Sequence, residues 1–192
     1  MSEIPLRSHV LHLPEHLSNG IQVSVHSVPR SFYLDLEAIL PGVPVRDGEP
    51  KLLLVPTCQR STVDLVNWGD IQAIEKDLLL ERFVAWAGAV CDALGSRGFW
   101  GDYVDPCSGQ AVRTPYSHSC YPEVEAFESL LKWRTFNCGG CKVLSHPEWQ
   151  TFVYPATLFA RAPLDALLEA MRHASETVVV KDRDSFLRER EG

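Results

Sequence analysis

The longest run with a single hydrophobic period is Asp77-Leu78-Leu79-Leu80-Glu81-Arg82-Phe83-Val84-Ala85-Trp86-Ala87-Gly88-Ala89-Val90-Cys91-Asp92-Ala93-Leu94. Its apolar residues recur at i, i+3, i+4 and i+7, the spacing of one helix face: Leu79, Leu80, Phe83, Val84, Ala87, Val90, Cys91 and Leu94. Gly95 and Gly98 follow, and glycine commonly ends a helix in the left-handed conformation. The run therefore predicts a helix over residues 77–94, with Cys91 in the core.

Shorter elements are expected on both sides of this helix. Residues 21–25 alternate apolar and polar side chains, which is typical of a half-buried strand. Similar patterns predict strands at residues 51–55, 61–68, 99–104, 141–144 and 149–159, and helices at residues 30–40, 124–133 and 162–173. Because the connections are too short for several right-handed crossovers, we expect an α+β fold with a mostly antiparallel sheet and flanking helices.

Length and composition fit one folded domain. The chain has 192 residues, 45% of them hydrophobic and 22% charged, as is usual for a globular domain. We expect an irregular N-terminal segment at residues 1–19, a single α+β domain at residues 20–173 and a charged C-terminal tail at residues 174–192.

Charge and targeting signals narrow the class of function. The net charge is -7 and there is no basic cluster, which argues against nucleic acid as the main partner. No apolar run is long enough to span a bilayer, and the N-terminus resembles neither a secretory signal nor a mitochondrial presequence. We therefore expect a cytoplasmic protein whose six cysteines are thiols, ligands or core residues.

The paired-cysteine motif Cys138-Gly139-Gly140-Cys141-Lys142-Val143 is the strongest candidate for a functional site. A cysteine thiolate is a soft ligand suited to late transition metals. Gly139 and Gly140 allow positive φ angles and the close approach of a bulky planar partner. Lys142 is expected to favour the thiolate through its positive charge.

Other readings of this motif stay open. A redox dithiol is one, although such pairs usually lie at a helix N-terminus and this one leads into a strand. A zinc-stabilised interaction domain is another, with His118, Cys120, Cys138 and Cys141 as ligands. The two cysteines could also simply pack in a turn. A flavin-type oxidoreductase is a further alternative, but the sequence contains no Arg-rich phosphate-binding segment and no G-x-G-x-x-G turn to support it.

The remaining chemically capable residues have structural explanations. Asp105 begins a turn in which its carboxylate caps backbone donors, so we do not expect Asp102 and Asp105 to form a catalytic pair. His146 precedes a proline at a corner between strands and is interpreted as structural. Cys58 and Cys107 have no nearby partner in the sequence and are interpreted as bystanders.

The order and spacing of several motifs resembles the cobalamin-trafficking proteins of the methylmalonic aciduria and homocystinuria type D (CblD) family. The motifs are Leu79-Leu80-Glu81-Arg82-Phe83, Cys91-Asp92-Ala93-Leu94, Gly98-Phe99-Trp100-Gly101-Asp102-Tyr103-Val104-Asp105-Pro106, Pro115-Tyr116, the paired-cysteine motif and His146-Pro147-Glu148-Trp149. The family's pattern fits without a gap from Trp68 to Gly109.

This resemblance implies a reduced nitroreductase-like fold without flavin. It also implies a non-enzymatic adaptor that binds a cobalamin-loaded CblC-type processing protein and supplies a cysteine thiolate to cobalt. Cobalamin would be shared with that partner rather than held tightly by this chain alone. The cofactor would then pass toward methionine synthase or methylmalonyl-CoA mutase.

The cysteine loop departs from the family's pattern. The family has Leu-Gly-Cys-Cys-Lys-Val here, and its first cysteine is the cobalt ligand. Aligned through Lys142 and Val143, that position is Gly140, Cys141 is the second cysteine, and Cys138 stands in place of leucine. The resemblance therefore leaves Cys141 or Cys138 as the cobalt ligand, and we expect Cys141 because it keeps the alignment.

Overall fold

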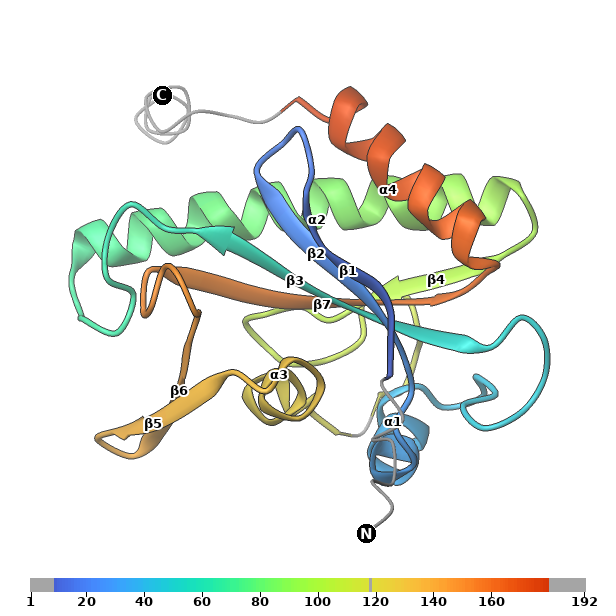
Figure 1. Ribbon diagram of the computed structural model, residues 1–192, viewed down its shortest axis with the longest axis horizontal. Coiled ribbons are helices and arrows are strands. Elements are labelled where there is room, and N and C mark those ends of the chain that lie inside the picture. The colour runs from blue at the N-terminus through green and yellow to red at the C-terminus, as the bar shows by residue number, and fades with distance from the viewer. Residues whose placement is uncertain (1–8, 118, 180–192) are drawn as a thin grey trace, which may run out of the picture.

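The fold is a five-stranded antiparallel sheet with helices on both faces and a separate two-stranded hairpin (Figure 1). The structure is a computed structural model that describes residues 9–117 and 119–179. Its strands are β1 (Val10–His16), β2 (Ile21–Ser27), β3 (Leu52–Arg60), β4 (Trp100–Tyr103), β5 (Arg134–Cys138), β6 (Cys141–Ser145) and β7 (Val153–Arg161). Its helices are η1 (Arg30–Phe32), α1 (Tyr33–Ile39), α2 (Asp70–Ser96), α3 (Glu123–Leu131) and α4 (Leu164–Thr177).

The large sheet has the order β1-β2-β3-β7-β4, and β5 pairs with β6 in the hairpin. Every strand pairing within the described residues is antiparallel. The prediction of an α+β fold with a mostly antiparallel sheet and flanking helices is therefore confirmed.

Helices cover both faces of the sheet because its central strands are apolar on both sides. Side chains alternate between the two faces of a strand. In β3, Leu53 and Val55 pack with α2 and α4, whereas Leu52 and Leu54 pack with α1 and α3. Figure 1 shows α2 and α4 on one side of the sheet and α1 and α3 on the other.

The long helix α2 is fixed against α4 and the short strand β4. The indole N–H of Trp86 donates a 3.2 Å hydrogen bond to the carbonyl oxygen of Met171 in α4. Cys91 is buried in this core, as predicted. A Cβ on Gly101 would lie 3.1 Å from the Cys91 sulfur, so glycine allows β4 to approach the helix closely.

Two parts of the sequence prediction are wrong. Residues 10–16 are not irregular but form strand β1, which pairs with β2 through two register shifts. These shifts interrupt the alternation that would have indicated a strand, and an edge strand tolerates Pro14. The strand expected at residues 61–68 is absent, because buried Glu75 accepts the backbone N–H of Thr62 and holds this segment as a loop.

Other boundaries are shifted. Helix α2 begins at Asp70 rather than residue 77, and β7 begins at Val153 rather than residue 149. Helix α4 continues to Thr177, beyond the expected start of the C-terminal tail at residue 174. The division into an N-terminal segment, one domain and a tail otherwise stays a prediction, and residues 1–8 and 180–192 lie outside the described residues.

Asp102 of β4 is a buried carboxylate with a structural role. It is 0% exposed and accepts the backbone N–H groups of Tyr103 at 2.7 Å, Arg113 at 2.8 Å and Thr114 at 2.8 Å. Asp105 instead caps an exposed turn through Cys107 and Ser108, as predicted. The two carboxylates therefore organise the segment that follows β4.

We expect Asp102→Asn to lower the free energy of unfolding by roughly 2–3 kcal/mol. Asparagine keeps one acceptor oxygen, but its NH₂ group cannot accept the backbone N–H that the other oxygen binds. Asp105→Asn is the matched control and should cost less than about 1 kcal/mol, since its turn is exposed to water. Urea unfolding followed by fluorescence measures both. Equal losses for the two variants would contradict the structural role assigned to Asp102.

Candidate functional site

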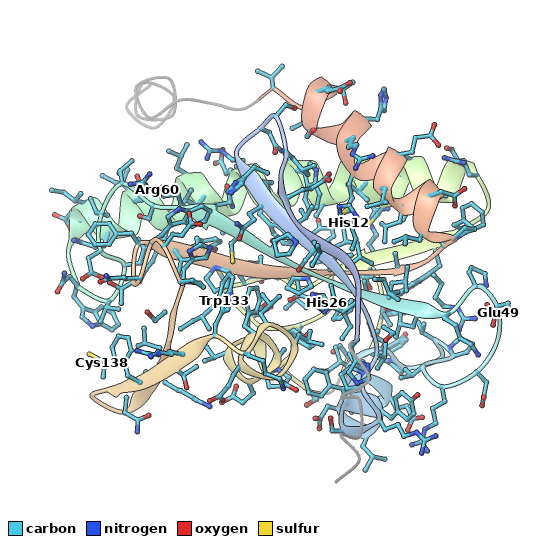
Figure 2. All side chains as sticks on the ribbon, in the orientation of Figure 1. His12, His26, Glu49, Arg60, Trp133 and Cys138 are labelled. Atoms are coloured by element: carbon cyan, nitrogen blue, oxygen red, sulfur yellow. The ribbon has the colours of Figure 1, made fainter. Side chains whose placement is uncertain are left out.

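The paired cysteines lie at the tip of the β5–β6 hairpin. Cys138 ends β5, Cys141 begins β6, and the two are directly paired across the strands. Gly139 has a φ of 59° and Gly140 has no positive φ, the pattern of a type II′ turn, which requires glycine at its first central position. Figure 2 shows Cys138 at the far end of the hairpin from Trp133. Both cysteines are free and exposed.

The hairpin is attached to α3 by polar contacts. The ammonium group of Lys142 lies 2.5 Å from a carboxylate oxygen of Glu128 and 3.8 Å from one of Glu125. The other oxygen of Glu128 accepts a 3.0 Å hydrogen bond from the Thr135 hydroxyl. The ion pair raises the pKa of Lys142 and lowers the pKa of Glu128. Lys142 thus holds the hairpin against α3, a role that differs from the expected support of a thiolate.

A small apolar cluster fixes the base of the hairpin. Leu144 of β6 packs with Phe127 of α3 and with Cys58 and Val153 of the large sheet. The tip extends beyond this cluster, and a Cβ on Gly139 or Gly140 would meet no atom within 4 Å. The site is therefore anchored at its base and open at its tip.

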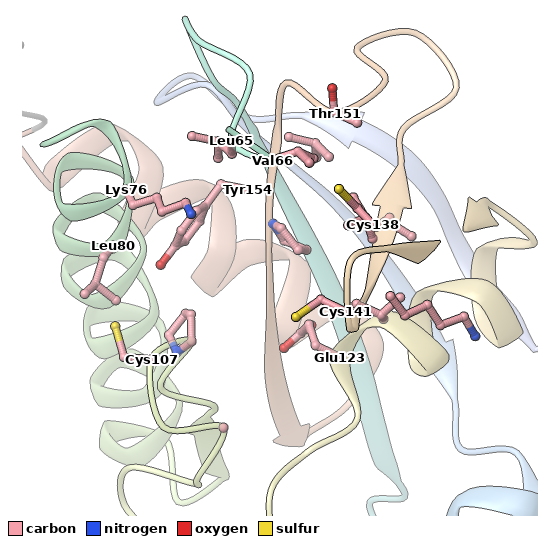
Figure 3. A pocket seen from close by; sticks show the side chains of 18 of the residues that line it. Leu65, Val66, Lys76, Leu80, Cys107, Glu123, Cys138, Cys141, Thr151 and Tyr154 are labelled. Atoms are coloured by element: carbon pink, nitrogen blue, oxygen red, sulfur yellow. The ribbon is translucent and has the colours of Figure 1, made fainter. Parts of the chain in front are cut away.

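A cavity of about 670 Å³ separates the hairpin from α2 and the turn after β4. Figure 3 shows Lys76 and Leu80 of α2 on one side and Cys138 and Cys141 on the other. Cys107 also lines this cavity, a position that the sequence did not indicate. All six residues of the paired-cysteine motif contribute to the wall. Apolar side chains make up most of the remaining wall, which is typical of binding cavities.

Glu123 is a functional candidate that the sequence did not indicate. It begins α3, lines the cavity, and accepts a hydrogen bond from the Thr157 hydroxyl. Burial raises the pKa of its carboxyl to about 7, although the Thr157 bond acts in the opposite direction. Burial and the nearby Glu123 also raise the pKa of the Cys58 thiol, so Cys58 is an inert core residue. An acid in the first turn of a helix looks like an ordinary helix-stabilising residue, and only the tertiary structure reveals its burial.

His146 is structural, as the sequence suggested. Its Nε2 contacts the side-chain oxygen of Gln22 at 3.1 Å, and its Nδ1 accepts the backbone N–H groups of Glu148 and Trp149. Its ring stacks on Trp149 with centroids 4.0 Å apart. Burial lowers the pKa of His146 to about 4, so the neutral ring is the form that closes the β6–β7 corner.

Metal-binding groups are not gathered within the described residues. No three His, Cys, Asp or Glu side chains there are close enough to hold one ion. The zinc set of the alternative reading is therefore not assembled by Cys120, Cys138 and Cys141, and His118 lies outside the described residues. In the same part of the chain, no helix combines the length and apolar character needed to cross a membrane.

These features define a class: an α+β protein that presents an exposed pair of cysteines on a hairpin beside a largely apolar cavity. The family model of the methylmalonic aciduria and homocystinuria type D protein matches residues 8–173. The chain belongs to this family, as the motifs suggested.

Relatives in the family are named for cobalamin trafficking. The cobalamin trafficking protein CblD of Homo sapiens is 30% identical over 149 residues, which cover 78% of this chain and 49% of that protein. The Mus musculus protein of the same name is 29% identical over the same shares. The Gallus gallus protein is 27% identical over 86% of this chain and 55% of its own length. The chain thus spans about half the length of the curated relatives it matches.

The turn conformation predicts different effects for alanine at its two glycines. Space around both positions is open, so only the positive φ of Gly139 distinguishes them. We expect Gly139→Ala to destabilise the hairpin by about 1–2 kcal/mol, whereas Gly140→Ala should change it by less than about 0.5 kcal/mol. Amide hydrogen exchange of β5 and β6 measures this. Similar exchange rates in both variants would contradict the assigned turn.

The raised pKa of Glu123 predicts a pH-dependent stability. The folded protein holds this proton up to about pH 7, whereas the unfolded chain releases it near the usual pKa of 4.5. The contribution of Glu123 to stability therefore falls as pH rises from about 4.5 to 7. We expect Glu123→Gln to gain stability relative to the wild type across this window, measured by urea unfolding at a series of pH values.

Glu128→Gln is the matched control, because the pKa of Glu128 is lowered by Lys142 and Thr135. The stability difference between the wild type and Glu128→Gln should be small and should depend on pH in the opposite sense. The wild type should lose stability relative to this variant as pH falls. Titration of His26 and His146 is common to all three proteins and cancels in these differences. A pH-independent difference for Glu123→Gln would show that its carboxyl titrates normally.

Proposed function

We propose that this chain is a non-enzymatic adaptor in cobalamin trafficking that supplies the Cys141 thiolate to cobalt. Membership of the CblD family and the relatives' names support the cobalamin pathway. The position of the paired cysteines carries the rest of the proposal, because they form the tip of a hairpin whose outer side is open. A buried dithiol could not reach a metal held by another protein.

The geometry supports Cys141 as the ligand and Cys138 as its neighbour. Cys141 begins β6 and directly precedes Lys142, which is paired with Glu128 of α3, whereas Cys138 ends β5, whose Thr135 contacts Glu128 three residues before it. A ligand needs a defined position, so the better-anchored cysteine is favoured. Gly139 and Gly140 leave room above the turn for a flat corrin ring. Sulfur is the soft donor that such a metal centre accepts.

The partner is a cobalamin-loaded CblC-type processing protein. Cobalamin is the shared cargo and no flavin takes part. The proposed docking surface combines the hairpin tip with the described part of residues 110–137, which contains loops, α3 and β5. Binding residues are often found on loops that a rigid scaffold positions. Glu125 and Glu128 lie on this surface, but both contact Lys142, so charge reversal there would also displace the hairpin. Positions on the hairpin tip that do not contact Lys142 are better probes of partner binding.

The wider role follows the resemblance. We propose that the fold is a reduced nitroreductase-like one, and that the adaptor directs cofactor toward methionine synthase or methylmalonyl-CoA mutase in the cytoplasm. The cysteine pair occupies a β-turn rather than a helix N-terminus, where a dipole would activate a thioredoxin-like thiolate. The dithiol-oxidoreductase alternative is therefore less favoured.

The proposal is tested with the CblC-type partner and cob(II)alamin. Cys141→Ser should abolish the thiolate-dependent change in the visible spectrum while leaving the fold intact, because a hydroxyl is a poor soft-metal ligand. Cys138→Ser should have the smaller effect. Cys107→Ser, which changes a cavity thiol away from the hairpin, is the matched control.

The other outcomes assign the site differently. Loss of the signal in Cys138→Ser with its retention in Cys141→Ser would make Cys138 the ligand. Retention of the signal in both single variants and in the double variant would contradict thiolate ligation by this hairpin. A pull-down with and without cobalamin reports partner binding separately.

A further inference from the structure

Cys138 and Cys141 are placed to form a reversible disulfide. They are directly opposed across the antiparallel hairpin, with only Gly139 and Gly140 between them. Opposed residues flanking such a turn have Cα atoms about 5.5 Å apart. A disulfide spans Cα separations of roughly 4.4–6.8 Å. A pairing of this kind therefore places the two Cα atoms within the range that the bond requires.

The side chains are free to complete this geometry. Both cysteines are exposed, and Figure 3 shows their sulfur atoms pointing in different directions in the reduced hairpin. Closing the bond needs rotation about χ1, which exposed side chains undergo within nanoseconds. Open space around the two glycines also lets a small disulfide approach the pair.

The other described cysteines lack this arrangement. Cys58 and Cys91 are buried, and burial raises the pKa of both thiols, so neither is an accessible nucleophile. Cys120 donates its S–H to the carbonyl oxygen of Ser108, and Cys107 lines the far side of the cavity. Only Cys138 and Cys141 are opposed in one strand pairing.

We propose that Cys138 and Cys141 are a redox modification site that a small-molecule disulfide such as glutathione disulfide closes. One cysteine thiolate attacks a glutathione sulfur and releases the first glutathione thiolate. The second cysteine thiolate then attacks the protein sulfur of the mixed disulfide and releases the second. Two protein thiols lose two electrons and two protons, and one glutathione disulfide becomes two glutathione molecules. Excess reduced glutathione reverses both steps.

The disulfide would regulate the hairpin. A sulfur committed to the Cys138–Cys141 bond is no thiolate and cannot ligate a metal. This consequence rests on the proposed function, whereas formation of the bond does not. Exposed disulfides are typically the labile and regulatory ones. Cys138 thereby gains a role as the resolving thiol.

The test uses the full reduced chain, incubated without oxygen in glutathione disulfide, acid-quenched and measured by intact mass and peptide mapping. Two thiols joined by so short a link have an effective concentration of at least about 1 mM. Reduced glutathione is the thiol that reopens the ring, so with it held at about 0.1 mM the internal disulfide should exceed the mixed disulfide by about tenfold. It should appear as loss of two hydrogen atoms mapped to the hairpin, and reduced glutathione should reverse it.

Two variants make the test specific. Cys138→Ser should instead accumulate a stable mixed disulfide on Cys141. The Cys107→Ser/Cys120→Ser variant keeps the hairpin pair as its only exposed cysteines among the described residues and should close as the wild type does. Persistent mixed disulfides in the wild type, a bond mapped to Cys107 or Cys120, or a covalent dimer would each overturn the proposal.

A second measurement separates this inference from the proposed function. Closed protein added to the CblC-type partner and cob(II)alamin should give no thiolate signal until it is reduced. If the disulfide never forms while the reduced protein gives the signal, only the redox inference fails. If the disulfide forms but the reduced protein gives no signal, the cobalt-ligand proposal fails and the modification site stands.

Discussion

The pairing of β3 with β7 is the interaction on which the rest of the structure depends. Nine residues pair in one unbroken register, from Leu52 with Arg161 to Arg60 with Val153. The two strands are remote in sequence, so their contact closes a long loop at an entropic cost that burial must offset. Both strands carry apolar side chains on both faces, and each face is covered by helices. A shift of one residue would exchange the two faces of β7, so that each layer of helices would meet side chains of different size and shape.

This register also determines where the cysteine hairpin lies. The hairpin enters β7 through the corner closed by His146, and Val153 at the start of β7 packs with Leu144 of the hairpin. Beyond that contact the hairpin is held by Lys142 and its carboxylate partners on α3. Exposed ion pairs contribute little, about 0–1 kcal/mol. The tip is therefore less strongly held than the sheet.

The sequence predicts the parts of the fold that local pattern controls. Residues 77–94 have a clear helical period because α2 buries one long stripe, and residues 21–25 alternate as β2 does. Strand β1 is hidden by its register shifts, and residues 61–68 alternate although Glu75 holds them in a loop. The conformation of these two segments depends on residues elsewhere in the chain, which a local sequence pattern does not include.

The candidate site, like the fold, has parts that the sequence predicts and parts that only the tertiary structure shows. The cysteines and glycines are visible in the sequence because their chemistry is local, and the hairpin bears out the strand expected after Cys141. The cavity is not visible, since its walls come from α2, the turn after β4, α3 and β7. Glu123 and Cys107 gain their positions only from that assembly. The role first expected of Lys142 differs for the same reason, because its nearest partner lies on α3, fourteen residues earlier in the chain.

The two glycines between Cys138 and Cys141 have a structural consequence. Adjacent residues in a strand point to opposite faces, so neighbouring cysteines in an extended segment cannot both face one ligand. Separating them by two glycines in a tight turn instead places them opposite one another on paired strands. The pair then shares one side of the hairpin, where one sulfur can remain available while the other is close enough to react with it. The same turn that leaves open space around its two glycines therefore also brings the two thiols together.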